Sequence, residues 1–139
     1  MEQYRKYDEL EIGQVLPDEP AVYNVDRASI DAFRGIAADT IVDSQSSTAA
    51  VAPPMLAAVY IRPAQNALKG PPGGVHAKQA FQFHHPVREG DRLATRLTVK
   101  EKYERKGRNY LVSETQTFNQ DDVLVTTGRI VQLWGNEDA

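Results

Sequence analysis

Apolar and polar residues alternate along most of the second half of the chain. This alternation defines four runs rich in Val, Thr, Tyr, Leu and Phe, at residues 76–83, 91–104, 109–119 and 123–134. A period of two predicts strands that bury one face. Glycine, asparagine or acidic residues, which favour tight turns, lie between the runs at residues 88–91, 105–108 and 119–122. The second half therefore predicts an antiparallel sheet of long strands.

The first half has a different periodicity. Residues 27–38 have the spacing of a short amphipathic helix, because apolar side chains recur three and four positions apart. The apolar face consists of Ile30, Phe33 and Ala37, and Asp26 or Ser29 is the candidate N-cap. Before this helix, residues 21–25 predict an extended segment, and residues 7–16 predict a surface turn.

A second helix is predicted to be buried. From residue 49 to residue 61 the side chains are small or apolar on every face, which is typical of a helix enclosed by other elements. Pro53 and Pro54 fit a first helical turn and not its middle, so this helix should begin near Pro54. Pro63 then ends or kinks the helix, and the Gly and Pro residues at 70–74 form the strongest break in the chain.

These elements predict an α+β fold in which one sheet of about five or six strands wraps round an apolar helix. That is the hotdog arrangement. A chain of 139 residues and 15.5 kDa fits one such domain over residues 1–139. Because the wrapped sheet leaves a strand edge open and one flank apolar, we expect a dimer at least.

Composition excludes several classes of function. The chain has no cysteine, so disulfides, thiolate zinc sites and cysteine nucleophiles are excluded. The net charge of −3 and the pI near 5.6 argue against a broad surface for nucleic acid. The longest apolar run is too short to span a bilayer, and residues 1–20 lack the apolar stretch of a secretory signal. We therefore expect a cytoplasmic protein that binds neither nucleic acid nor membrane.

Several ordered motifs carry a resemblance to a known family. They are Tyr-Asp-Glu-Leu-Glu-Ile-Gly at residues 7–13, Ala-Pro-Pro-Met at 52–55, His-Ala-Lys-Gln-Ala-Phe-Gln-Phe-His-His-Pro-Val-Arg-Glu-Gly-Asp at 76–91 and Tyr-Glu-Arg-Lys-Gly at 103–107. Together they resemble the MaoC-like hydratase/dehydratase group, and within it the amino-terminal, dehydratase-like half. The resemblance runs over nearly the whole chain.

The resemblance implies reversible addition of water across the double bond of a 2-enoyl thioester on coenzyme A or an acyl carrier. In the catalytic branch of the group, an Asp and a His separated by four residues follow the short helix, and backbone N–H groups polarise the thioester carbonyl. Asp39 occupies the matching acidic position, whereas Ser44 stands in place of the His and Pro54 falls near the N–H donor. Serine alone cannot replace a histidine base, and proline has no N–H. Asp39 and Ser44 also suit a polar loop that caps the next helix.

We expect the ligand tunnel between the loop at residues 39–55, the start of the buried helix and the strand that begins at His76. Pro54 and Met55, at the start of that helix, are therefore candidate substrate contacts. His76 is a candidate catalytic residue on the same grounds, and it also fits a structural role as a strand-end histidine bonded to backbone.

The other histidines and the basic residues suggest further contacts. Strand alternation should point His84 and His85 to opposite faces, so at most one should face a pocket. The spacing of the histidines predicts no metal site, and we expect no cofactor. The basic segment at residues 100–108 makes Arg105 and Lys106 candidate contacts for coenzyme A phosphates, although such a run is also typical of a solvated hairpin.

Three functions are compatible with these observations. The first is a hydratase/dehydratase acting on acyl thioesters. The second is a non-catalytic subunit, because the half of the family that this chain resembles often pairs with a catalytic hotdog, and Ser44 in place of histidine suits such a subunit. The third is a hotdog thioesterase or a non-catalytic acyl-CoA-binding protein, and the absence of Asp and Glu from residues 54–66 counts against thioesterase chemistry. The expected partners are an acyl thioester and another hotdog subunit, in a homodimer or a heterodimer.

Overall fold

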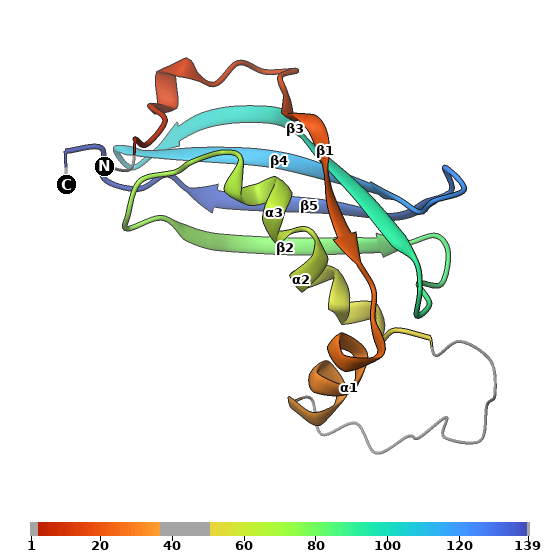
Figure 1. The fold of residues 1–139 in the computed structure, drawn as a ribbon. Helices are drawn as coiled ribbons and strands as arrows, with labels where there is room; N and C mark the ends of the chain where they lie inside the picture. Colours follow the sequence, from red (N-terminus) through yellow and green to blue (C-terminus); the bar gives the residue numbers. More distant parts are fainter. Residues whose placement is uncertain (1–2, 37–50, 139) are drawn as a thin grey trace.

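The computed structural model describes residues 3–36 and 51–138. Its five strands form one antiparallel sheet in the order β1-β3-β4-β5-β2 (Figure 1). The strands are β1 (Val15–Asn24), β2 (Val75–Phe83), β3 (Arg92–Arg105), β4 (Arg108–Phe118) and β5 (Leu124–Leu133). The four strands predicted from alternation are confirmed to within one residue at each end. The first strand is longer than the extended segment predicted at residues 21–25.

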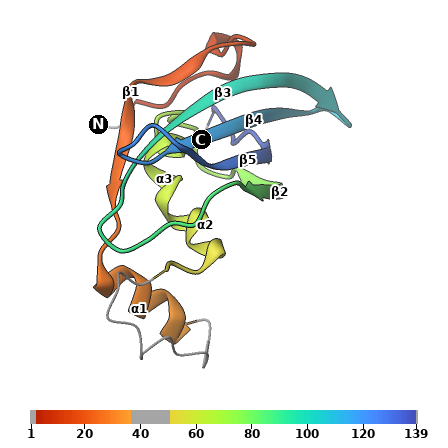
Figure 2. The ribbon, with the colours of Figure 1, turned by 90° about the vertical axis from the view of Figure 1, so that its right-hand side faces the viewer.

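The sheet curves round the helical segments α2 (Ala57–Tyr60) and α3 (Arg62–Asn66), which lie against its concave inner face (Figure 2). A 3₁₀ turn, Pro54–Leu56, leads into α2, so the predicted start of the helix near Pro54 is confirmed. Pro63 sits in the first turn of α3, so the helix kinks at Ile61 and continues instead of ending there.

The central helix is less enclosed than its composition predicts. Leu56, Ala57, Tyr60 and Ile61 are buried against Leu93, Val125 and Ile130 of the sheet. Met55, however, is 52% exposed. The prediction of burial on every face is therefore wrong for the first turn, which projects past the end of the sheet.

The helix α1 (Arg27–Ile36) lies beyond the end of the sheet, beside the start of the central helix (Figure 1). Asp26 is its cap, because the Ser29 backbone N–H donates to Asp26 Oδ1 at 2.7 Å. The hydrogen bonds from Ser29 lower the pKa of Asp26. Ile30 is fully buried, as the predicted apolar face requires.

The amino-terminal segment contains the predicted surface turn, at Gly13, but the residues on either side of that turn pack into the molecule. Tyr7, Leu10 and Leu16 are buried in a second core cluster with α3, β3 and β4. The Tyr7 hydroxyl donates to the Tyr110 carbonyl at 2.6 Å, and Lys102 Nζ lies 4.5 Å from the centre of the Tyr7 ring. Burial raises the pKa of Tyr7. The segment therefore closes the end of the core opposite α1.

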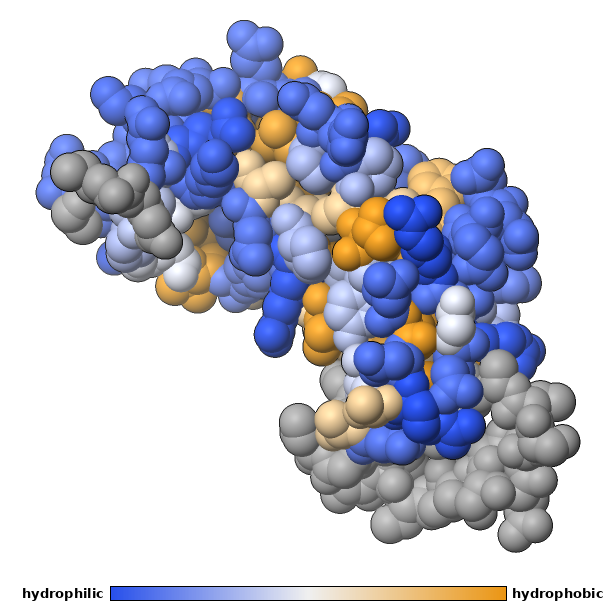
Figure 3. Space-filling model, viewed as in Figure 1, coloured by the Kyte–Doolittle hydropathy of each residue, from blue (hydrophilic) through white to orange (hydrophobic). Residues whose placement is uncertain are grey.

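The strand β2 is one edge of the sheet, and nearly all its residues are exposed. Val75 and Phe83, near its two ends, are 56% and 45% exposed. The side of the molecule seen in Figure 3 is mostly hydrophilic, with separate apolar patches. In the described part of the chain, no helix is long and apolar enough to cross a membrane.

Candidate functional site

A cavity of about 350 Å³ opens at the start of the central helix. We call it the helix-start pocket. It is lined by residues 51–54, Tyr60, residues 83–87 and Thr126. Most of these side chains are apolar, so the pocket suits a hydrocarbon chain better than a polar ligand.

The antiparallel sheet explains why these segments meet. Phe83, the last residue of β2, pairs with Thr126 of β5, so the end of one strand and the beginning of the other lie side by side. Tyr60 reaches Thr126 from the central helix, and the two hydroxyls share a hydrogen bond. Val51 forms an isolated bridge with Arg88, which holds the chain before the helix against the segment that follows β2.

The hydrogen-bonded hydroxyls of Tyr60 and Thr126 are the most deeply placed polar groups of the pocket. Tyr60 is 2% exposed and Thr126 is 1% exposed. Burial raises the pKa of Tyr60, so its hydroxyl stays protonated across the neutral range. The pair can therefore offer a neutral hydrogen-bond donor to a carbonyl oxygen in an otherwise apolar cavity.

His84 and His85 both belong to the lining of the helix-start pocket. They directly follow Phe83, the last residue of β2. The backbone N–H groups of both histidines point at the Val125 carbonyl, at 2.9 and 3.4 Å. The ring of His84 is fixed by a 3.0 Å hydrogen bond between Nε2 and Thr127 Oγ1. The expectation that at most one of the two side chains faces the pocket stays a prediction.

Among the described residues that line the helix-start pocket, none carries a carboxylate. The candidates Asp39 and Ser44 lie outside the described residues. Pro54 lines the pocket, whereas the exposed Met55 does not. Pro53 and Pro54 supply no backbone N–H at the start of the helix. The described lining therefore offers hydroxyls and imidazoles but no acidic group.

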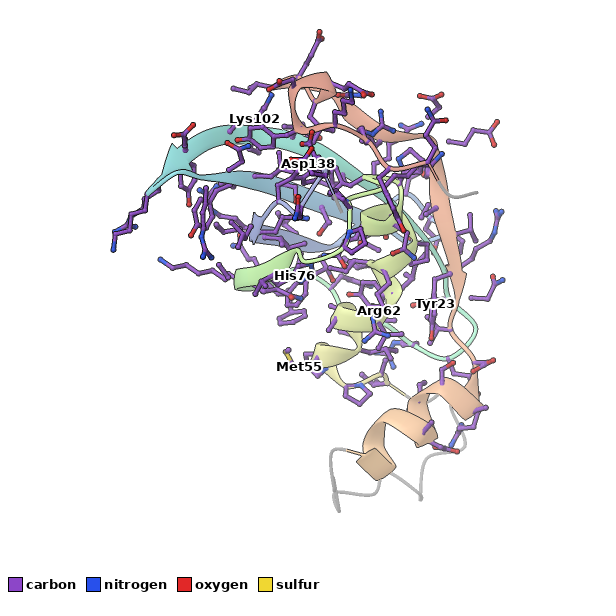
Figure 4. The ribbon with its side chains drawn as sticks, turned by 90° about the vertical axis from the view of Figure 1, so that its left-hand side faces the viewer. Tyr23, Met55, Arg62, His76, Lys102 and Asp138 are labelled. Atoms are coloured by element: carbon purple, nitrogen blue, oxygen red, sulfur yellow. The ribbon has the colours of Figure 1, made fainter. Side chains whose placement is uncertain are left out.

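His76 lies at the other end of the central helix. It lies near the beginning of β2 (Figure 4), whereas Phe83, at the other end of that strand, lines the helix-start pocket. His76 lines a different cavity, of about 680 Å³, together with Gln132 and the turn at residues 70–74. His76 therefore does not line the helix-start pocket of its own chain, because β2 begins beside the end of the central helix and runs back toward its start. The part of the expected tunnel formed by residues 39–50 lies outside the described residues and stays a prediction.

Arg105 and Lys106 lie at the tip of the β3–β4 hairpin, away from the helix-start pocket. They line a cavity of about 480 Å³ with residues from β2 and β5. The structure therefore separates the predicted substrate contacts into two places, with Pro54 in one and the basic pair in the other. No group of three or more His, Asp or Glu residues that could hold a metal ion occurs among residues 3–36 and 51–138.

Comparison with known proteins gives the family. The profile of the FAS1-like dehydratase domain region matches residues 12–128. The chain belongs to this family. A search of curated protein sequences found no match.

Solved structures show the same fold. An R-hydratase from Pseudomonas aeruginosa, PhaJ1, is 23% identical with a TM-score of 0.74, over 94% of this chain and 86% of that one. The 3R-hydroxyacyl-ACP dehydratase complex HadBC from Mycobacterium tuberculosis is 25% identical with a TM-score of 0.69, over 88% and 96%.

A third structural neighbour names the fold itself. A Mycobacterium tuberculosis protein with a double hotdog fold is 19% identical with a TM-score of 0.70, over 98% of this chain and 46% of that one. Other neighbours are named MaoC-like dehydratases. The predictions of an α+β hotdog fold and of a MaoC-like protein are confirmed, and this family is of the hydratase/dehydratase type.

Proposed function

We propose that this chain is the acyl-binding subunit of a two-subunit hydratase/dehydratase that acts on 2-enoyl thioesters. It holds the acyl chain in the helix-start pocket, and a second hotdog subunit supplies the catalytic base. The observation that carries this proposal is the chemistry of the described lining, which is apolar, has no carboxylate and begins its helix with two prolines.

The apolar lining supports the binding half of the proposal. Each methylene that an acyl chain buries stabilises its binding by about 0.8 kcal/mol. A cavity of about 350 Å³ can therefore contribute measurable affinity even for a short acyl chain. The Tyr60 and Thr126 hydroxyls lie where a thioester carbonyl could accept a hydrogen bond. One polar contact in an apolar pocket is enough to orient such a ligand.

The catalytic half of the proposal concerns the groups that would activate water and stabilise the enolate. Hydration requires a base that deprotonates water and donors that stabilise the developing enolate. Ser44 stands where the family that this chain resembles has histidine, and the prolines remove the N–H groups that would face the carbonyl. Without a histidine partner, Asp39 supplies only one of the groups that this acid–base chemistry needs.

The exposed edge of β2 supports the partner half of the proposal. Unpaired N–H and C=O groups on a sheet edge pair readily with another strand. Exposed apolar residues near both ends of β2 favour an antiparallel contact, because each end of one strand then meets the opposite end of the other. The similarity to HadBC, a complex of two named components, favours a different hotdog subunit over a second copy.

Activity measurements test the proposal directly. The chain is purified alone and together with each hotdog protein encoded beside it, and hydration of a crotonyl thioester is followed for both preparations. We expect the chain alone to be slower than the complex by roughly 10²- to 10⁴-fold, the usual contribution of a positioned acid or base. Robust turnover by the isolated chain would show that the subunit proposal is wrong.

Two variants locate the active groups. In the isolated chain, Asp39→Asn should leave the residual rate unchanged, and Asp31→Asn, an exposed change on α1, is the matched control. In the complex, Ala52→Leu should raise KM for long acyl chains, because Ala52 lines the helix-start pocket and is 5% exposed. Release of free thiol from the same thioester would instead favour the thioesterase function.

A further inference from the structure

The outer face of the sheet carries a groove that the proposed chemistry does not use. Its volume is about 480 Å³, which lies in the range of small-molecule sites. Residues from four strands form it, and we call it the outer-face groove. It lies on the side of the sheet turned away from α2 and α3, so it is separate from the helix-start pocket.

Strand register builds the floor of the outer-face groove. Val112 pairs with Val131, and the row continues to Glu101 on β3 and to Lys78 on β2. Val112 is 1% exposed although no described helix covers this face of the sheet. The long side chains around it therefore cover the apolar floor with their methylene stems and keep their charged ends at the rim.

One wall of the groove is aromatic. Tyr103 and Tyr110 are directly opposite in the register, and their rings stack with centroids 5.1 Å apart and planes 8° from parallel. Tyr103 is 38% exposed, so part of its ring is accessible. A rigid, preordered aromatic pair is a surface on which a planar heterocycle can stack at little entropic cost.

The rest of the rim is positively charged. Lys78, Arg105, Lys106 and Arg129 line the groove, against the single carboxylate of Glu101. Arg129 is 3.9 Å from Glu101, and none of the other three cations forms an ion pair with a described residue. The chain as a whole carries a net charge of −3, so this concentration of positive charge is local.

A solvated hairpin does not account for this arrangement. Arg105 ends β3 and Lys106 begins the β3–β4 turn, but Lys78 and Arg129 come from β2 and β5. A bulge between His76 and Lys78 sets the register that brings Lys78 opposite Val131. Cations from three separate segments thus converge on one aromatic pair.

We propose that the outer-face groove binds a nucleoside phosphate. The base stacks on Tyr103, and the phosphates contact Arg105, Lys106 and Lys78, since guanidinium and ammonium groups are the usual ligands of phosphate. The nucleotide end of coenzyme A and a free nucleotide share this chemistry. The binding site does not depend on the proposed function, whereas its assignment to coenzyme A rests on it.

Calorimetric titration of the full-length protein tests the site. The probes are adenosine 3′,5′-bisphosphate, ADP, adenosine and inorganic pyrophosphate. We expect both nucleotides to bind more tightly than adenosine or pyrophosphate, and we expect added salt to weaken their binding because the phosphate contacts are exposed. Tighter binding of the bisphosphate than of ADP would assign the groove to coenzyme A, and equal binding would assign it to a free nucleotide.

Variants connect the binding to the groove. Tyr103→Leu should weaken nucleotide binding by about tenfold, the scale of one lost stacking contact. Arg105→Gln combined with Lys106→Asn should weaken it further and flatten its salt dependence. Arg62→Ser is the matched control, because Arg62 is an exposed cation on α3, away from the outer face. Thermal unfolding confirms that each variant is folded.

Two results would overturn the proposal. One is the absence of nucleotide binding at millimolar concentrations by the folded wild-type protein. The other is binding of an acidic carrier protein that depends on the same cations while no nucleotide binds. Hydration of a crotonyl N-acetylcysteamine thioester, which has no nucleotide, reports on the proposed function separately, so the failure of one proposal is distinguishable from the failure of the other.

Discussion

The two faces of the sheet differ in what their side chains do. The inner face carries Leu93, Leu97 and Ile130, which are fully buried against the helices and the amino-terminal segment. The outer face carries Lys78 and Arg129, which are exposed round an apolar floor. Inner-face residues therefore hold the fold and shape the helix-start pocket, whereas outer-face residues are available for recognition. Substitutions on the two faces should separate stability from binding.

The inner face is not uniformly apolar, because it also carries buried hydroxyl groups. Thr95 and Thr117 share a hydrogen bond of 2.8 Å inside the sheet. Ser113 Oγ and Thr115 Oγ1 are buried without a hydrogen-bond partner among the described residues. Buried hydroxyls of this kind tolerate little change in their surroundings. A substitution that crowds the inner face should therefore lower the free energy of unfolding more than one that removes a contact on the outer face.

The largest effect is expected for Gly128→Val, at the centre of β5. A Cβ on Gly128 would overlap Thr115 Oγ1 and approach the Phe81 ring to 3.0 Å, and Val adds two further methyl groups. We expect the free energy of unfolding to fall by about 3 kcal/mol, as for other overpacked cores. Denaturant titration measures the fall.

Gly107→Ala is the control for Gly128→Val. Gly107 has a φ of +75°, but nothing lies within 4 Å of the position of its Cβ. Alanine there should cost about 1 kcal/mol through backbone strain alone. Equal losses for the two variants would show that crowding on the inner face is not the cause.

A smaller loss is expected for Tyr60→Phe in the helix-start pocket. The change removes the hydrogen bond to Thr126 and leaves that buried hydroxyl unpaired, which costs about 1–2 kcal/mol. Tyr60→Phe combined with Thr126→Val should recover part of the loss, because no unpaired group remains. A double-mutant cycle measured by chemical unfolding gives the coupling, and a coupling of zero would contradict the hydrogen bond.

Alkaline unfolding sharpens the same point. Burial raises the pKa of Tyr60 in the folded protein, so the unfolded chain loses this proton first as the pH rises. Stability should therefore fall from about pH 10 upward, and the fall should be shallower in Tyr60→Phe. The pKa of Tyr7 is raised as well, so Tyr7→Phe should remove a separate part of the slope.

The strands could be predicted from sequence because alternation and turn residues are local signals. The burial of Tyr7 could not, because its partners Lys102 and Tyr110 lie about a hundred positions away. The position of His76 relative to the helix start depends on the direction of its strand, and the alternation of apolar and polar residues does not give that direction.

Only part of the outer-face groove could be predicted from the sequence. The hairpin residues Arg105 and Lys106 stood out as a basic run. Lys78 and Arg129 join them only through sheet order and a bulge, and neither can be read from a single sequence. The same holds for Tyr60 and Thr126, which meet in the helix-start pocket from a helix and a strand.

On the outer face, Tyr103→Leu should change stability little. The stacked pair with Tyr110 contributes about 0.5–1 kcal/mol, and leucine retains part of the apolar contact. The same variant should lose about tenfold in nucleotide affinity. Calorimetry and unfolding of one preparation compare the two effects, and a loss of stability as large as that of Gly128→Val would contradict the division of labour between the faces.

The smallest effect, and one of opposite sign, is expected for Lys106→Asn. Lys106 and Gly107 form the two-residue turn of the β3–β4 hairpin, with φ values of +53° and +75°. Such a turn favours Asn-Gly, because asparagine adopts a positive φ more readily than lysine. The variant should therefore gain roughly 0.5 kcal/mol in stability while its affinity for nucleotide falls. Thermal unfolding measures the gain in stability, and calorimetric titration measures the loss of affinity. Unchanged affinity in the stabilised variant would show that Lys106 does not contact the phosphates, which would then be bound by Arg105 and Lys78.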